Sequence, residues 1–106
     1  GWSASTGDAD WGIRPLLYGQ SFPPAMFNVA YFKDAKVDAA IEGAISTADP
    51  AKRAEFYAEA QKAAWEGAPW IFLGVNQNLS AKSKALSGVY MLPDRGFLLE
   101  EAAFAE

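Results

Sequence analysis

The sequence predicts an α+β fold that forms part of a larger α/β architecture, in the order strand, long loop, two helices and then several strands. Three observations lead to this prediction. Two alanine-rich segments, one beginning after Asp34 and one covering residues 50–66, have the apolar spacing of helices. Residues 70–75 form a continuous apolar run of strand length. Turn residues then separate several short apolar segments further along the chain.

Composition excludes several classes of function. The 106 residues suffice for one small domain, and 51% of them are hydrophobic, which is typical of a globular protein. Nine Lys and Arg residues against thirteen Asp and Glu residues give a net charge of −4, so a nucleic-acid footprint is not expected. The chain has no cysteine and no histidine, which excludes disulfides, thiolate metal sites and a Ser-His-Asp triad within it. Since it begins at Gly1, we expect a mature product or an excised piece of a longer protein.

The N-terminal third predicts little regular structure beyond one strand. Residues 1–6 read as a short strand that enters a turn at Gly7 and Asp8, because small and hydroxyl residues follow a large aromatic. Residues 8–32 read as an irregular loop that contains three prolines and six aromatic residues. Within this loop, Pro15 is suited to open a short helix, since proline fits the first turn.

Two helices are predicted in the middle of the chain. Asp34 is a suitable N-cap for the first helix, whose apolar face is formed by Val37, Ala40, Ile41 and Ala44. Asp49 and Pro50 are the expected cap and first residue of the second helix. Gly67 is the expected residue just beyond its end, and Pro69 prevents continuation.

The C-terminal part predicts short strands. Residues 70–75 read as a strand buried on both faces, and residues 79–86 as a second short strand. Residues 89–92 and 97–100 are two further strand candidates, and the strong turn signal of residues 93–96 separates them. The remaining alanine-rich tail predicts weak structure. Because these strands do not close a sheet by themselves, we expect them to belong to a larger fold.

Three patterns that resemble functional sites are better explained by structure. Asp8 and Asp10 do not start a calcium loop, because the twelfth position from Asp8 is Gly19 where a glutamate is needed. Glu100 and Glu101 are adjacent and therefore lack the defined separation of a glycosidase pair, so a solvated surface is expected. The aromatic residues between positions 11 and 32 fit core packing better than stacking on a sugar or a base.

Residues 1–6 could also form an exposed strand that binds a peptide. An exposed strand with free backbone N–H and C=O groups can pair with an extended peptide, and neighbouring side chains then supply selectivity. Trp2 and the hydroxyls of Ser3, Ser5 and Thr6 are suited to such a role. An ordinary edge or internal strand remains the simpler interpretation of this segment from its residues alone.

Short motifs occur in a characteristic order along the chain. They are Gly1-Trp2 before a Gly-Asp-x-Asp turn, Phe27-Asn28, Tyr31, Val37-Asp38, Asp49-Pro50-Ala51-Lys52-Arg53, Tyr57, Ala60-Gln61, Ala68-Pro69-Trp70-Ile71 and the segment 86–93. This order resembles the C-terminal region of the extracellular solute-binding proteins that serve peptide, glutathione and nickel ABC importers. Within that family, residues 1–7 and 91–97 look most like the glutathione-binding branch.

The resemblance implies a two-lobed periplasmic receptor that closes on its ligand, docks on an ABC permease and catalyses no reaction. Residues 1–78 would belong to the second large lobe, and residues 79–106 would return through the hinge towards the first. The remainder of the receptor chain would be a partner of this region, no cofactor is implied, and Asn28 and Tyr31 would be structural. The residues implied to line the ligand are Trp2, Ser3, Ala4, Ser5 and Thr6.

Ser5 departs from the pattern of the peptide-binding relatives. In those proteins an aspartate three residues after the tryptophan pairs with the α-amino group of the peptide, and a neutral hydroxyl cannot form that charge-assisted bond. The departure fits a ligand such as glutathione, whose N-terminal end is a γ-glutamyl group. A dipeptide or oligopeptide receptor of the same family, a self-contained aromatic interaction module and a small carboxylate hydrolase are the alternatives.

Overall fold

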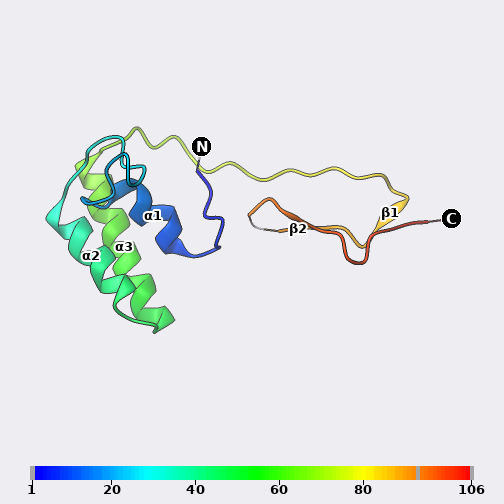
Figure 1. Ribbon diagram of the computed structural model, residues 1–106, viewed down its shortest axis with the longest axis horizontal. Coiled ribbons are helices and arrows are strands. Elements are labelled where there is room, and N and C mark those ends of the chain that lie inside the picture. Colours follow the sequence, from blue (N-terminus) through cyan, green and yellow to red (C-terminus); the bar gives the residue numbers. More distant parts are fainter. Residues whose placement is uncertain (1, 93, 106) are drawn as a thin grey trace. The chain divides into compact units, whose positions relative to one another are not determined.

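Three helices precede four two-residue strands in the structure, which is a computed structural model that describes residues 2–92 and 94–105 (Figure 1). The helices are α1 (Ala9–Leu17), α2 (Ala35–Ile45) and α3 (Pro50–Gly67). The strands are β1 (Leu86–Ser87), β2 (Tyr90–Met91), β3 (Phe97–Leu98) and β4 (Ala103–Phe104). The predicted order, with a strand first and two helices, is therefore wrong, although both helices and short strands are present. The chain divides into a helical unit that ends at Phe72 and a second unit that begins at Leu73.

Helix α1 replaces the first part of the loop predicted for residues 8–32, and the strand predicted before it does not form among residues 2–6. Residues 2–4 form no strand, and a turn follows them directly. The helix begins after Asp8, whose carboxylate accepts a hydrogen bond from the backbone N–H of Asp10 at 2.8 Å. Pro15 lies inside the helix rather than at its start, and it is buried together with the apolar face of α1. The cap at Asp8 therefore determines where the helix begins.

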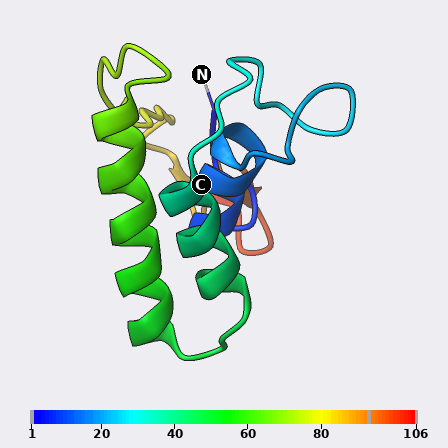
Figure 2. The same cartoon turned by 90° about the vertical axis from the view of Figure 1, so that its left-hand side faces the viewer.

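Helices α2 and α3 form an antiparallel pair joined by a short connection (Figure 2). Both predicted N-caps are confirmed, because the Asp34 carboxylate accepts from two backbone amides of α2 and the Asp49 carboxylate from two of α3. The four apolar residues predicted for α2 are all buried. Two alanines of α3, Ala60 and Ala64, are buried as well, and their small side chains allow the two helices to approach closely.

The end of α3 differs from the prediction by one residue. Gly67 is still helical, and the left-handed residue is Ala68, with a φ of 44°. A Cβ atom on Gly67 would lie 2.9 Å from the ring of Phe32, so glycine is needed here for packing rather than for backbone freedom. Ala68 takes the left-handed conformation and donates its N–H back to the carbonyls of Ala64 and Trp65, which ends the helix.

The hydrophobic core lies entirely within the helical unit and is mainly aliphatic. It combines one face from each helix, consisting of Ile13, Leu16, Leu17, Val37, Ala40, Ile41, Ala44, Tyr57, Ala60 and Ala64. Of the aromatic residues between positions 11 and 32, only Tyr18 and Phe32 pack against this core, while Phe27 and Tyr31 are exposed. The expectation that these aromatics form a core is thus met only in part.

Asn28 holds the loop between α1 and α2 in place. Its side chain is fully buried, donates to the carbonyls of Tyr18 and Phe32, and accepts from the Phe32 N–H. All the hydrogen bonds lead to backbone groups, so the amide substitutes for secondary structure in this loop. The structural role expected of Asn28 is confirmed.

The second unit contains two small antiparallel ladders. Strand β1 pairs with β4, and β2 pairs with β3 on either side of a turn that includes Asp94 and Arg95. The strand candidates at 89–92 and 97–100 are therefore confirmed over two residues each, and the tail contributes β4. Pro93, the first residue of the predicted turn, lies outside the described residues.

The predicted strands at 70–75 and 79–86 do not form as such. Residues 71–83 adopt neither helix nor strand, and only Leu86 of the second segment is in a ladder. The first run is also exposed rather than buried, with Ile71 at 88% and Val75 at 99% of full exposure. A strand needs a partner, and the described residues supply none for this run. Among the described residues, no helix is both long and apolar enough to cross a membrane.

Candidate functional site

The five residues predicted to line a ligand lie immediately before α1. Trp2, Ser3, Ser5 and Thr6 are exposed, and Ala4 is half-buried. We call residues 2–6 the ligand segment. Its backbone is not part of a sheet, and no hydrogen bond to another described residue involves the backbone of Ser3 or Ser5. These amides and carbonyls are therefore available to an incoming polar group.

A tight turn connects the ligand segment to α1. The Gly7 N–H donates to the Ala4 carbonyl at 2.9 Å, and the Asp8 N–H donates to the Thr6 hydroxyl at 3.2 Å. Gly7 has a φ of 70°, a conformation that favours glycine. Asp8 then caps α1 with its carboxylate. The end of the ligand segment is thus fixed by the same residue that starts the helix.

The other end of the ligand segment is held by Trp2. Its indole Nε1–H donates to the Trp11 carbonyl at 2.8 Å, and its ring contacts the rings of Trp11 and Phe27, with centroids 5.8 and 5.1 Å away. In a regular helix the Trp11 carbonyl would accept from the N–H of residue 15. Pro15 has no N–H, so this carbonyl is open to the indole.

Arg53 of α3 connects three parts of the helical unit. Its Nη2 donates to both carboxylate oxygens of Asp8, at 2.7 and 2.8 Å, and its Nη1 donates to the Ala44 carbonyl in the last turn of α2 at 3.0 Å. The guanidinium also lies over the Tyr57 ring, 5.4 Å from its centroid. The sequence contains Arg53 within a recognisable motif but does not reveal these contacts.

A second ion pair lies within α1, and a hydrogen bond from Tyr57 connects it to α3. Arg14 donates to both oxygens of Asp10 at 2.6 to 2.9 Å, and the Tyr57 hydroxyl donates to the same carboxylate at 3.2 Å. The hydrogen bond from Arg14 holds the pKa of Asp10 below its ordinary value of 3.8. Burial, followed by the nearby Asp10 charge, raises the pKa of Tyr57 to about 12. Both groups therefore keep their usual charge states at neutral pH.

Several hollows lie on the surface of the helical unit. One of about 390 Å³ adjoins the ligand segment and is lined by Thr6, Asp8, Asp10, Trp11, Arg14, Ile45 and Arg53. It contains one of the five predicted residues, and its two arginines are already paired with its two aspartates. The structure therefore places Thr6 at this hollow and the other four predicted residues outside it.

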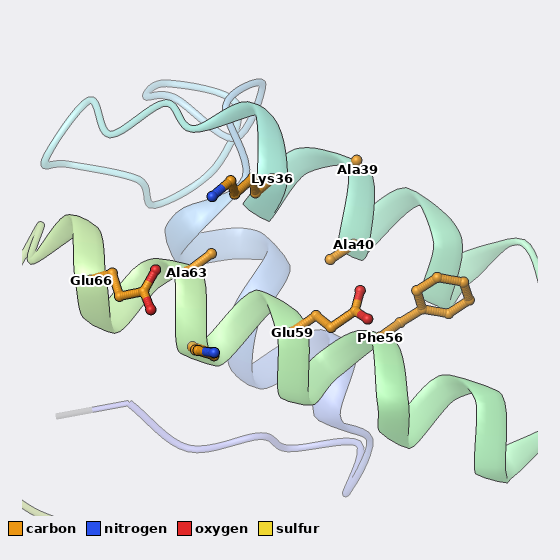
Figure 3. Close-up of a pocket in the computed structure, with 8 residues that line it drawn as sticks. Lys36, Ala39, Ala40, Phe56, Glu59, Ala63 and Glu66 are labelled. Atoms are coloured by element: carbon orange, nitrogen blue, oxygen red, sulfur yellow. The ribbon is translucent and has the colours of Figure 1, made fainter.

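A larger open groove of about 580 Å³ runs between α2 and α3 (Figure 3). Alanines form much of its lining, and Lys36, Glu59, Lys62 and Glu66 surround them. None of the predicted ligand residues contributes to it. Three of these charged residues are spaced three and four apart on α3, which is the arrangement of a solvated helix face.

Acidic residues do not gather into a metal site anywhere in the part of the chain that the structure describes. The carboxylates of Asp8 and Asp10 act as cap and ion-pair partners, as expected from the failure of the calcium pattern. Glu100 and Glu101 are exposed in a turn, which agrees with the expected solvated surface.

No family model matches the chain. Individual relatives match it over nearly its whole length. Glutathione-binding protein GsiB of Pectobacterium atrosepticum is 45% identical over 106 residues, which is 100% of this chain and 21% of the relative. The protein of the same name from Escherichia coli K12 is 45% identical over 102 residues, which is 96% of this chain and 20% of the relative.

The chain is homologous to part of a glutathione-binding protein. The GsiB protein of Salmonella choleraesuis, at 44% identity over 102 residues, gives the same result. The resemblance to the glutathione-binding branch, inferred from the order of motifs, is thereby confirmed. The chain spans about one fifth of the length of these GsiB relatives. Their name describes binding rather than a reaction, in agreement with the expectation that the chain is not an enzyme.

Proposed function

We propose that this chain contributes the ligand segment to a periplasmic solute-binding receptor that captures glutathione and delivers it to an ABC permease. The observation that carries the proposal is the 45% identity to a glutathione-binding protein along the whole chain. In this view, residues 1–78 belong to one lobe of the receptor and residues 79–106 lead towards the other. The rest of the pocket and the surface that meets the permease come from receptor residues outside this chain.

The exposed polar groups of the ligand segment support the proposal. Glutathione carries an amino group, amides, a thiol and two carboxylates, so a site for it needs several hydrogen-bonding groups. The backbone of Ser3 and Ser5 and their two hydroxyls offer donors and acceptors without a partner among the described residues. Both ends of the segment are held in place by Trp2 and Asp8, which lowers the entropy lost on binding.

A segment exchange tests the proposal. These 106 residues replace the matching segment of E. coli GsiB, which is 45% identical, and calorimetry measures the affinity of the purified chimera for glutathione and for a dipeptide. The expected result is glutathione binding within about tenfold of the parent receptor and weaker binding of the dipeptide. A second chimera, in which Ser3 and Ser5 are both changed to proline, removes two backbone donors and two hydroxyls.

The two chimeras give distinct outcomes. Loss of glutathione binding only in the proline chimera, with unchanged circular dichroism, supports a ligand role for residues 2–6. A folded first chimera that binds no glutathione contradicts the proposed function. Preference for the dipeptide would instead assign the chain to a peptide receptor of the same family.

A further inference from the structure

We propose that Arg53 is a positioning residue for the ligand segment, which it holds through Asp8 although it touches no ligand itself. The inference rests on the proposed function for residues 2–6 and adds a residue that lies 45 positions beyond Asp8 in the chain. This one side chain joins Asp8, which caps α1 and directly follows the turn after the ligand segment, to the last turn of α2.

The geometry at Asp8 supports a positioning role. One oxygen of the carboxylate accepts from the Asp10 N–H at the start of α1, and both oxygens accept from Arg53. The backbone N–H of the same residue donates to the Thr6 hydroxyl. Asp8 is thus connected both to Arg53 and to the last residue of the ligand segment.

Two contacts other than the one with Asp8 also fix the position of the Arg53 side chain. Its other terminal nitrogen donates to the Ala44 carbonyl, and its plane lies over the Tyr57 ring. An exposed ion pair normally contributes little, because two long side chains must be ordered to form it. Here the arginine side chain is only 23% exposed and already ordered by two other contacts, so its bond to Asp8 costs less entropy.

The second ion pair of this region, unlike that of Arg53, does not connect separate elements. Arg14 and Asp10 are four residues apart on α1, so their contact lies within a single helix. It does not join the ligand segment to α3. Of the two ion pairs found among the described residues, only the one between Arg53 and Asp8 spans separate elements.

Nuclear magnetic resonance of the 106-residue chain without ligand tests the positioning directly. Arg53→Gln removes the charged contact, and Asp8→Asn does so while keeping a good N-cap. Lys52→Gln is the matched control, because it removes the same charge from the adjacent, exposed position of α3. The measurement is ¹⁵N relaxation of the Ser3 to Thr6 amides and of the Trp2 indole, with far-UV circular dichroism as a check on the helices.

We expect Arg53→Gln and Asp8→Asn each to increase the mobility of the ligand segment, and the double variant to increase it no further. Lys52→Gln leaves it unchanged. If the ligand segment has the same ¹⁵N relaxation in Arg53→Gln as in Lys52→Gln, with all helices intact, the inference is overturned. If Arg53→Gln unfolds α3, Asp8→Asn decides, because it leaves Arg53 and its contact with Ala44 in place.

Affinity in the E. coli chimera separates this inference from the proposed function. Arg53→Gln should weaken glutathione binding about fivefold, as expected for loss of one preorganising contact, and Lys52→Gln should not. Unchanged affinity in a chimera that binds glutathione overturns the positioning role. If the parent chimera binds none, the proposed function fails, while the relaxation data still decide whether Arg53 holds the segment.

Discussion

The indole N–H of Trp2 donates to the main-chain carbonyl of Trp11, 2.8 Å away, at the one helical position that Pro15 leaves without an intrahelical donor. Proline inside a helix normally costs stability because a backbone hydrogen bond is lost. In this chain the vacant acceptor is used by a side chain from the preceding segment. The proline thereby creates an attachment point for the ligand segment.

Replacing Trp2 by phenylalanine tests that attachment. Trp2→Phe keeps an aromatic ring next to Trp11 and Phe27 but removes the N–H donor, so the free energy of unfolding should fall by about 0.5–1 kcal/mol. Urea titration, with circular dichroism as the signal, measures this free energy of unfolding. Trp65→Phe is the control, because Trp65 is also exposed and stacked on an aromatic ring, with no indole hydrogen bond to another described residue. Equal losses in the two variants would contradict the role of the indole N–H.

The ion pair of Asp10 predicts a pH dependence. Because Arg14 lowers the pKa of Asp10 in the folded chain, the unfolded chain takes up this proton at a higher pH than the folded chain does. Its contribution to stability is therefore complete above the ordinary pKa of 3.8 and is lost as the pH falls through the lower folded value. Urea unfolding between about pH 6 and pH 2 should show a shallower acid loss for Asp10→Asn than for the parent chain. Parallel curves would show that the pair does not stabilise the fold.

Gly88 controls the ladder of β1 and β4. Its φ is 65°, and a Cβ atom there would collide with the backbone carbonyl of Glu101. Gly88→Ala should therefore destabilise this ladder by at least about 1–2 kcal/mol, from the left-handed conformation alone. Loss of the cross-strand nuclear Overhauser contacts between Leu86 and Phe104 measures the effect. Gly12→Ala, in a helix with open space around the new Cβ, should leave these contacts unchanged.

Ser5 is expected to determine selectivity. Introducing a carboxylate by Ser5→Asp in the E. coli chimera should strengthen dipeptide binding by about tenfold, because the α-amino group of the dipeptide gains a charge-assisted partner. It should weaken glutathione binding by about tenfold, because the γ-glutamyl end carries an α-carboxylate beside its amino group and the new carboxylate repels it. Ser5→Asn is the control, since asparagine has nearly the same size as aspartate but carries no charge. Titration calorimetry with both ligands measures the ratio. An unchanged ratio in the aspartate variant would remove Ser5 from the set of specificity residues.

Local sequence signals predicted α2 and α3 well. Asp34 and Asp49 cap their own helices, and the apolar residues of α2 repeat at helical spacing, so neither helix needs information from distant residues. The end of α3 needed such information. Gly67 looked like the left-handed residue, but Phe32, far away in the sequence, requires the missing side chain there, and Ala68 takes the left-handed conformation.

The strands and the site were harder to predict because they too depend on contacts between residues that lie far apart in the sequence. The apolar run at 70–75 has the composition of a buried strand, but a strand forms only with a partner, and the described residues provide none. Similarly, Trp2 could be singled out from the sequence, whereas its bond to Trp11 could not. The contact of Arg53 with Asp8 was also invisible, because 45 residues separate the two.

The irregular run that follows α3 has a consequence for handling the protein. Proteases bind their substrates as exposed, extended segments of several residues, and folded helices resist them. Residues 71–83 lack regular structure, and they include Phe72, a preferred site of chymotrypsin, and two secondary sites, Leu73 and Leu79, at 93% and 88% exposure. Brief digestion should therefore cut here first and leave the three helices, together with the ligand segment and Arg53, as the resistant product.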